Sequence, residues 1–497
     1  MSEVSGRAPV PPRVPTGIRG VDDVLGGGLF ASGVYIVMGM PGVGKTILGN
    51  QLAFHHVRSG GRAVYVTLLS ETHGRLLAFM QTMSFFDGSV VGDALRYLNG
   101  YTAVEAEGLP GLLRLIRQVV RESKASLLVV DGMMTAASIA RSDVEYKKFV
   151  QELQSWIEVV GCTVVLLTSA RADELHPEYT MVDGIVELEY ARAGGRRIRE
   201  LTVLKFRGSA YVEGSHTYDI TSDGIALFPR VEAVFGRRPR ERLDEAVAGF
   251  GVPELDRLLG GGLPRGSTAI VLGPTGTGKT MLGLQFVAAG LAAGEPSVHL
   301  SFSEDPAATL AVGDALGLEL SEHARARKLT LIWHPVAEPS IDRIGHELVS
   351  AVERSGAQRV FVDGLEAIRD PSIAERLTSY WAALGQEMRA RGATVLTSAE
   401  ARHPMLGVAD PAAAGVSGIV DTVLCLDRTR RAGALIGVMF VPKVRGRRHE
   451  STLMEYEMTH RAIRIVGRFE EDDARGAGRS ARRKRRSSTG GGSRRKR

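Results

Sequence analysis

Two short stretches of this chain have the residue types and spacing of a phosphate-binding loop. Residues 273–280 read Gly-Pro-Thr-Gly-Thr-Gly-Lys-Thr, which fits GxxxxGK[ST] at every fixed position. Glycines at these positions let successive backbone N–H groups point at phosphate oxygens. Lys279 can reach the β- and γ-phosphates, and Thr280 can ligate Mg²⁺. The pattern therefore predicts a site for ATP and Mg²⁺.

The same loop occurs earlier, at 39–46, and the two loop lysines are 234 residues apart. A Gly-Gly-Gly lead-in at 26–28 recurs at the same offset, at 260–262. A repeat this long indicates a duplicated domain rather than a solenoid unit. The predicted nucleotide-binding residues are Gly39, Gly42, Val43, Gly44, Lys45 and Thr46 in the first copy and Gly273, Gly276, Thr277, Gly278, Lys279 and Thr280 in the second.

Acidic residues follow apolar runs in both copies. Asp131 ends a run at 126–130, and Asp363 ends one at 359–362. An acid at a strand end completes the Mg²⁺ site begun by the loop threonine. The predicted metal ligands are Thr46, Asp131, Thr280 and Asp363.

Glu71 and Glu304 follow the strand that comes after each loop helix, and they are the predicted catalytic residues. A carboxylate at the carboxyl end of such a strand points into the ligand crevice, where it can orient an attacking water. A solvated loop glutamate is the alternative. The hydroxyl pairs Thr168-Ser169 and Thr397-Ser398 end later strands and can sense the γ-phosphate, although plain strand-end polarity explains them nearly as well.

Near the end of each copy stands a Lys-x-Arg-Gly segment, with Lys205 and Arg207 in the first and Lys443 and Arg445 in the second. Alternation along a strand puts the two cations on one face. Their recurrence suggests a shared anion, while a solvated cationic edge is the equal alternative.

Strand and helix patterns alternate between these motifs. Apolar runs at 63–68 and 163–168 read as buried strands, and 109–123 and 146–160 as amphipathic helices. This order predicts an α/β fold with a parallel, doubly wound sheet in each copy. The predicted organisation is a flexible N-terminus at 1–12, domains at 13–235 and 247–469, a linker at 236–246 and a disordered basic tail at 470–497.

The net charge of +6 comes from the tail, because residues 474–497 hold eleven Lys and Arg and no acid, which leaves −5 for 1–473. We expect non-specific polyanion binding by this tail; a purely solubilising role is the alternative. Cys162 and Cys425 lie in apolar runs, so no disulfide framework is expected. With no apolar run of about 18 residues and no signal-peptide core, the sequence predicts a cytoplasmic protein with no membrane span.

In these loops, acids, Ser-Glu segments and Lys-x-Arg-Gly strands, the chain resembles the KaiC family of RecA-like ATPases over about residues 14–468. The resemblance implies two tandem RecA-like P-loop domains and a homo-hexameric double ring with ATP between subunits. It also implies that Lys205, Arg207, Lys443 and Arg445 contact the neighbouring subunit's nucleotide, and that an unidentified signalling protein is a partner.

Two departures from the family pattern bear on activity. The family often has two consecutive glutamates at the catalytic position, whereas Ser70 and Ser303 replace the first of them here. Slow hydrolysis is therefore expected. The clock member phosphorylates an adjacent Ser-Thr pair; only Ser417 remains here, with Gly418 in the threonine position. Serine/threonine autokinase activity is expected to be weak or absent.

Two other functions compete with a KaiC-like ATPase in signalling or timing. A RecA-type DNA recombinase or helicase motor, a DNA-dependent ATPase of recombination or repair, needs basic, aromatic-bearing loops. The segment 171–179, however, holds more acid than base, and 401–407 has a single Arg. A non-hydrolysing, nucleotide-gated scaffold is the third reading, favoured by the missing glutamates.

Overall fold

The computed structural model describes residues 11–69, 73–169, 177–193, 196–236, 245–335, 340–365, 375–402, 418–431 and 433–470. They divide into two compact units. The first holds the described residues up to 236 together with 340–347 and 375–384, and the second holds the others.

Over its described residues, the first unit contains a nine-stranded sheet in the order β11-β10-β9-β8-β3-β7-β6-β4-β5. The strands from β8 to β5 in this order run parallel, and β9, β10 and β11 continue the sheet as antiparallel neighbours. Their bounds are β3 Val34–Gly39, β4 Ala63–Thr67, β5 Leu95–Asn99, β6 Leu127–Asp131, β7 Thr163–Thr168, β8 Gly184–Ala193, β9 Arg196–Phe206, β10 Ser215–Thr221 and β11 Gly224–Phe228.

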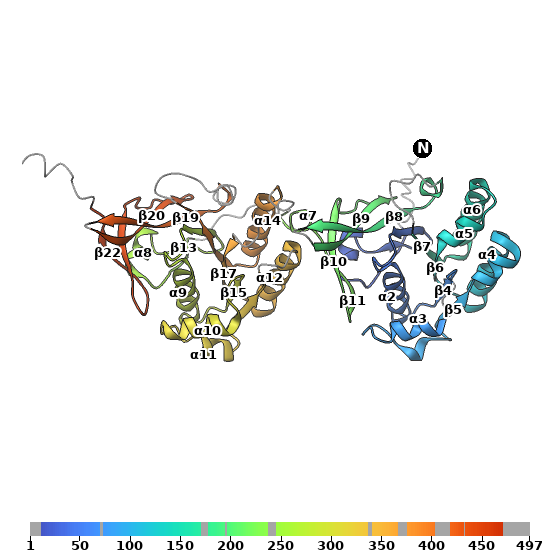
Figure 1. The fold of residues 1–497 in the computed structure, drawn as a ribbon, viewed down its shortest axis with the longest axis horizontal. Helices are drawn as coiled ribbons and strands as arrows, with labels where there is room; N and C mark the ends of the chain where they lie inside the picture. The colour runs from blue at the N-terminus through green and yellow to red at the C-terminus, as the bar shows by residue number, and fades with distance from the viewer. Residues whose placement is uncertain are drawn as a thin grey trace, which may run out of the picture. The chain divides into compact units, whose positions relative to one another are not determined.

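Helices cover both faces of this sheet, as Figure 1 shows. Every residue of β3, β4, β6 and β7 is buried, which explains why these strands read as continuous apolar runs. One apolar core lies on the side of α2 (Lys45–Arg58) and α3 (His73–Met80). The other lies under α4 (Tyr101–Ser123), α5 (Met133–Ile139) and α6 (Asp143–Val160). Smaller elements of this unit are β1 Arg13–Val14, α1 Val21–Leu25, β2 Leu29–Phe30 and α7 Val231–Val234.

The second unit repeats this plan over its described residues, in the order β16-β15-β17-β18-β14-β19-β20-β21-β22. Its large-sheet strands are β14 Thr268–Gly273, β15 Ser297–Ser301, β16 Leu329–Trp333, β17 Arg359–Asp363, β18 Thr394–Glu400, β19 Thr422–Arg431, β20 Ala434–Val444, β21 Met454–Met458 and β22 Ile463–Arg468. The remaining elements are β12 Val247–Ala248, α8 Pro253–Leu258, β13 Leu263–Pro264, α9 Lys279–Ala292, α10 Pro306–Ala315 and α11 Leu320–Arg325. Two further helices, α12 Ile341–Ser355 and α14 Leu377–Ala390, begin in the first unit and end in the second.

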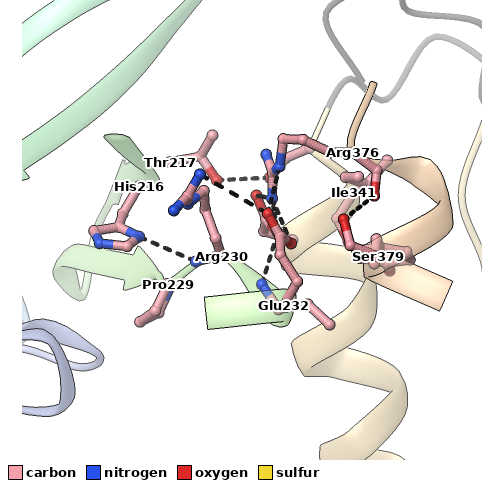
Figure 2. Close-up of polar contacts among 12 residues, drawn as sticks. His216, Thr217, Pro229, Arg230, Glu232, Ile341, Arg376 and Ser379 are labelled. Carbon is pink, nitrogen blue, oxygen red and sulfur yellow. Dashed lines mark hydrogen bonds and ion pairs between the residues drawn. The ribbon is translucent and has the colours of Figure 1, made fainter. Parts of the chain in front are cut away.

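A buried ion cluster ties the late segments 340–347 and 375–384 into the first unit (Figure 2). Arg376 donates from Nε and Nη2 to the two carboxylate oxygens of Glu232, at 2.7 and 2.9 Å. The same Nη2 donates to Asp342 Oδ1 at 2.9 Å, and that oxygen also accepts from the Val231 backbone N–H at 3.0 Å. One guanidinium therefore holds α7 against the starts of α12 and α14.

The expected alternation of strands and helices is confirmed, with some differences at the level of elements. The edge strands β5 and β16, which the sequence pattern did not predict, complete the parallel part of each sheet. Helix α4 begins eight residues before the predicted 109, because Gly108 and Pro110 sit at a kink that joins two helical pieces.

Cys162 and Cys425 are buried free thiols. Among the described residues, no helix is long and apolar enough to cross a membrane.

Candidate nucleotide-binding sites

Each predicted phosphate loop joins a central strand to the helix that follows it. The first loop connects β3 to α2 and the second connects β14 to α9. Gly44 and Gly278, directly before the helices, have φ of 110° and 93°, a conformation that residues with a Cβ rarely adopt. Each loop therefore lies at a helix N-terminus, where backbone N–H groups and the helix dipole favour an anion.

The loop lysines fold back on their own loops. Lys45 Nζ donates to the carbonyls of Gly39 and Met40 at 2.6 and 3.0 Å. Lys279 Nζ makes the same contacts with Gly273 and Pro274, at 2.8 and 3.1 Å. Burial lowers the pKa of Lys45, against the opposing charge of Asp131.

The hydroxyl of each loop threonine donates to the predicted metal-binding carboxylate. Thr46 Oγ1 lies 2.8 Å from Asp131 Oδ2, and Thr280 Oγ1 lies 2.8 Å from Asp363 Oδ2. Burial raises the pKa of the Asp131 carboxyl, and this effect is larger than the opposing effect of the hydroxyls that donate to the carboxylate. A hydroxyl and a carboxylate beside a phosphate loop are the hard oxygen donors that Mg²⁺ takes together with nucleotide phosphates. The two pairs of residues fit this ion.

Two tyrosines that the sequence analysis did not identify donate hydrogen bonds to the phosphate loops from other strands. Tyr218 on β10 donates to the Val43 carbonyl at 2.6 Å, and Tyr456 on β21 donates to the Thr277 carbonyl at 2.7 Å. In the first unit, the Gln51 side chain makes two hydrogen bonds with the Ile225 backbone. The Gln51 amide nitrogen donates to the Ile225 carbonyl, and the Gln51 amide oxygen accepts from the Ile225 N–H. The sequence signal that could have pointed to these contacts is the presence of a tyrosine near the end of each copy.

The carbonyl of the middle loop glycine has a different partner in each copy. Tyr190 on β8 donates to Gly42 O at 2.8 Å, whereas the Arg428 guanidinium on β19 donates to Gly276 O. A cavity of about 470 Å³ lies beside the second loop, with Arg428, Tyr456 and Met458 in its lining. Met458 packs against Gly278, so this cavity adjoins the loop.

Of the two predicted catalytic glutamates, Glu71 lies outside the described residues. Glu304 follows β15, whose last residue, Ser301, pairs with Asp363 of β17. The Glu304 N–H donates to Ser301 Oγ at 3.1 Å. Partial burial, with the nearby Asp363 and Asp305 carboxylates, raises the pKa of Glu304. This glutamate therefore stands close to the candidate metal-binding carboxylate.

The Lys-x-Arg residues lie at the opposite end of each sheet from their own loop. Arg207 follows β9 and donates to the carbonyls of Thr180 and Met181. Its backbone N–H bonds to Asp183, whose N–H bonds to Val34 at the start of β3. The loop begins after Gly39, about 17 Å away at ~3.3 Å per residue. Lys205 Nζ donates to the carbonyls of Tyr179 and Thr180.

The second copy repeats this placement. The Arg445 N–H bonds to Asp421, whose N–H bonds to Thr268 at the start of β14. The Arg445 side chain pairs with the Asp421 carboxylate at 3.4 Å, and Lys443 Nζ donates to the Gly418 carbonyl at 3.2 Å.

The two hydroxyl pairs, Thr168-Ser169 and Thr397-Ser398, are not at equivalent positions in the two sheets. Val37 of β3 pairs with Leu167, whereas the matching Val271 of β14 pairs with Ser398. Leu167 and Ser398 are therefore equivalent, because strand register rather than the local Thr-Ser pattern sets the alignment. Ser398 Oγ donates to Asp363 Oδ1.

Two parallel-centred sheets, each with a phosphate loop after a central strand and an acid two strands away, define a pair of tandem RecA-like P-loop domains. The model of the KaiC ATPase family matches residues 14–232 and 248–470. The chain belongs to the KaiC ATPase family.

Curated relatives match along nearly the whole chain. The circadian clock oscillator protein KaiC of Picosynechococcus sp. is 23% identical over 470 residues, covering 92% of this chain and 90% of that protein. KaiC 1 of Synechocystis sp. is 25% identical over 486 residues, covering 90% and 88%. KaiC of Prochlorococcus marinus is 26% identical over 475 residues, covering 92% and 93%. The chain is thus a KaiC-like ATP-binding protein.

Proposed function

We propose that both copies bind Mg·ATP and hydrolyse it slowly at the interfaces of a homo-oligomeric ring, by analogy a hexamer, in a signalling or timing role. Backbone N–H groups of each loop bind the phosphates, and the loop lysine turns from its carbonyl partners to the β/γ-phosphates. Thr46 with Asp131, and Thr280 with Asp363, hold Mg²⁺, which neutralises phosphate charge during transfer. Glu71 and Glu304 orient the attacking water.

The position of the Lys-x-Arg pairs is the observation that supports the ring. Arg207 is level with the start of β3, while the phosphate loop follows the end of that strand. The backbone of β3 rises about 17 Å between this level and the loop, and the Arg207 guanidinium is bonded to the carbonyls of Thr180 and Met181 rather than directed at its own loop. A neighbouring subunit's nucleotide at this edge would give both pairs the trans role that the family resemblance implies.

Steady-state ATP turnover with and without single-stranded DNA tests this function. We expect slow turnover that needs Mg²⁺ and does not change with DNA. Stimulation by DNA of tenfold or more would favour a recombinase, and tight binding without turnover would favour a scaffold. Ser417 lies outside the described residues; weak autokinase activity and polyanion binding by the tail stay predictions.

A further inference from the structure

The two candidate metal carboxylates are held by different hydrogen bonds. In the first copy, Asp131 Oδ2 accepts from Thr46 and also from the Tyr65 hydroxyl, at 2.8 and 2.9 Å. Tyr65 lies on β4, next to β6 in the sheet, and is completely buried. A buried hydroxyl needs a partner, and here the partner is the carboxylate itself.

Tyr65 belongs to a larger polar network in the first copy. Its ring packs against Tyr97 of β5, with centroids 5.3 Å apart. The Tyr97 hydroxyl donates to Asn50 Oδ1 at 2.7 Å, and Asn50 Nδ2 donates to the Thr46 carbonyl at 2.8 Å. The bonded pair of Asn50 and Tyr97 therefore links the backbone of Thr46 to the ring of Tyr65, the two residues that donate to Asp131.

The three side chains that brace the first site, Tyr65, Asn50 and Tyr97, are replaced in the second copy. The residues 234 positions later are His299 for Tyr65, Leu284 for Asn50 and Leu331 for Tyr97. His299 stacks on Phe361, with centroids 5.0 Å apart, and its Nδ1 lies 3.3 Å from the Phe361 carbonyl oxygen.

In the second copy, a hydroxyl from a different strand replaces Tyr65 as the second donor to the metal carboxylate. Ser398 of β18 bonds the Oδ1 oxygen of Asp363, while Thr280 bonds Oδ2. Ser398 Oγ in turn accepts from the Gly364 N–H at 2.9 Å. In the first copy this position is Leu167, which has no donor.

We propose that Tyr65 is a positioning residue for the Mg²⁺ carboxylate of the first site, and that Ser398 has this role in the second. The inference rests on the proposed function, because it requires Mg·ATP in both copies. Hydroxyl donors fix the orientation of a ligating carboxylate, and loss of such a partner lowers metal affinity by roughly 10–100-fold. The duplicated sites are thus tuned independently, by residues on different strands.

The test measures binding of a fluorescent ATP analogue to the full chain while free Mg²⁺ is varied. Lys279→Ala silences the second site, so that the first is read alone; Lys45→Ala does the reverse. Tyr65→Phe should raise the Mg²⁺ concentration for half-maximal binding at the first site by roughly 10–100-fold. Ser398→Ala should do the same at the second site. As controls, Tyr65→Phe in the Lys45→Ala chain and Ser398→Ala in the Lys279→Ala chain should leave the Mg²⁺ midpoint of the remaining site unchanged.

A rescue separates positioning from packing. Leu167→Ser, added to Tyr65→Phe, supplies the donor that the second copy uses and should bring the Mg²⁺ midpoint back toward the parent value. An unchanged midpoint in Tyr65→Phe, or a loss of binding that is equal at all Mg²⁺ concentrations, would overturn the inference. If Tyr65→Phe does not fold, the Ser398→Ala shift decides it. Absence of Mg²⁺-dependent binding in the unmodified chain would instead overturn the proposed function, and this inference with it.

Discussion

At the scale of single residues, the loop lysines are the groups on which the two sites depend most directly. Lys45 and Lys279 each contact two carbonyls of their own loop. A lysine in this position supplies the contact to the β- and γ-phosphates. The two loops also share the tyrosine contact to the carbonyl before the last glycine. Both copies therefore have the parts needed to bind nucleotide.

Lys45→Ala and Lys279→Ala should each remove about half of the ATP bound to the chain at saturation, since each variant loses one phosphate contact set. Equilibrium dialysis with radiolabelled ATP gives the stoichiometry, and the double variant should bind almost none. A single variant that keeps the full stoichiometry would mean that its copy is not a working site.

What the sequence could predict at this scale was the local part of the site. The loops, their lysines and threonines are contiguous, and glycine requirements mark them. Asp131 and Asp363 could be placed because each ends a buried strand. The contacts of Tyr65, Ser398 and Tyr218 could not be predicted, although Ser398 was singled out as a strand-end hydroxyl, because these contacts depend on the order of strands in the sheet.

At the scale of elements, register and strand order decide what the motifs can do. The strands on either side of the loops were predicted from apolar runs, and their pairing then fixed Leu167 opposite Val37. The edge strands β5 and β16 are half exposed, with few fully buried residues, so periodicity gave no clear signal. The cluster around Arg376 could not be predicted from the sequence either, because Glu232 lies more than 100 residues before both Asp342 and Arg376.

Arg376→Ala should destabilise the first unit by about 3–5 kcal/mol, because it leaves a buried carboxylate without its cation. The Asp342 side chain is only 2% exposed, and burial already raises its pKa. Urea denaturation followed by circular dichroism measures the loss. Arg343→Ala is a matched control: its bridge to Asp219 is exposed, with side chains 38% and 40% accessible, so about 1 kcal/mol or less is expected. Equal losses for both variants would show that the cluster contributes no more than a surface pair.

At the scale of the whole molecule, the chain is a duplication whose two copies share a plan and differ in detail. Two nine-stranded sheets, two phosphate loops and two Lys-x-Arg segments recur over the described residues. The loop threonine donates to the metal carboxylate in both copies, but the second donor to that carboxylate and the donor to the middle loop glycine differ between the copies. If both sites work as proposed, these differences predict that the two copies bind nucleotide with different Mg²⁺ requirements.

The last prediction concerns assembly, since among the described residues the arginine at the second loop, Arg428, has no counterpart in the first copy, where Tyr190 contacts the matching glycine. Arginine supplied from a neighbouring subunit fills such a gap in related chemistry, at about 10³–10⁵ in rate. Arg207→Ala with Arg445→Ala should therefore cut turnover strongly. Each subunit should stay folded, because Arg207 bonds backbone carbonyls and Asp421 keeps its closer ion pair with Arg389, at 2.6 Å, when Arg445 is replaced.

Mixing this variant with Glu71→Gln/Glu304→Gln should restore activity to about a quarter of the parent value. In randomly mixed rings, about one interface in four joins an intact glutamate to an intact arginine, since head-to-tail contacts repeat around a ring. A chain carrying all four substitutions is the control, because mixing it with either variant creates no complete interface. Native mass spectrometry must show mixed oligomers. If they form and turnover does not recover, the basic pairs act within their own subunit or outside the site, and catalysis does not need the neighbour's arginine.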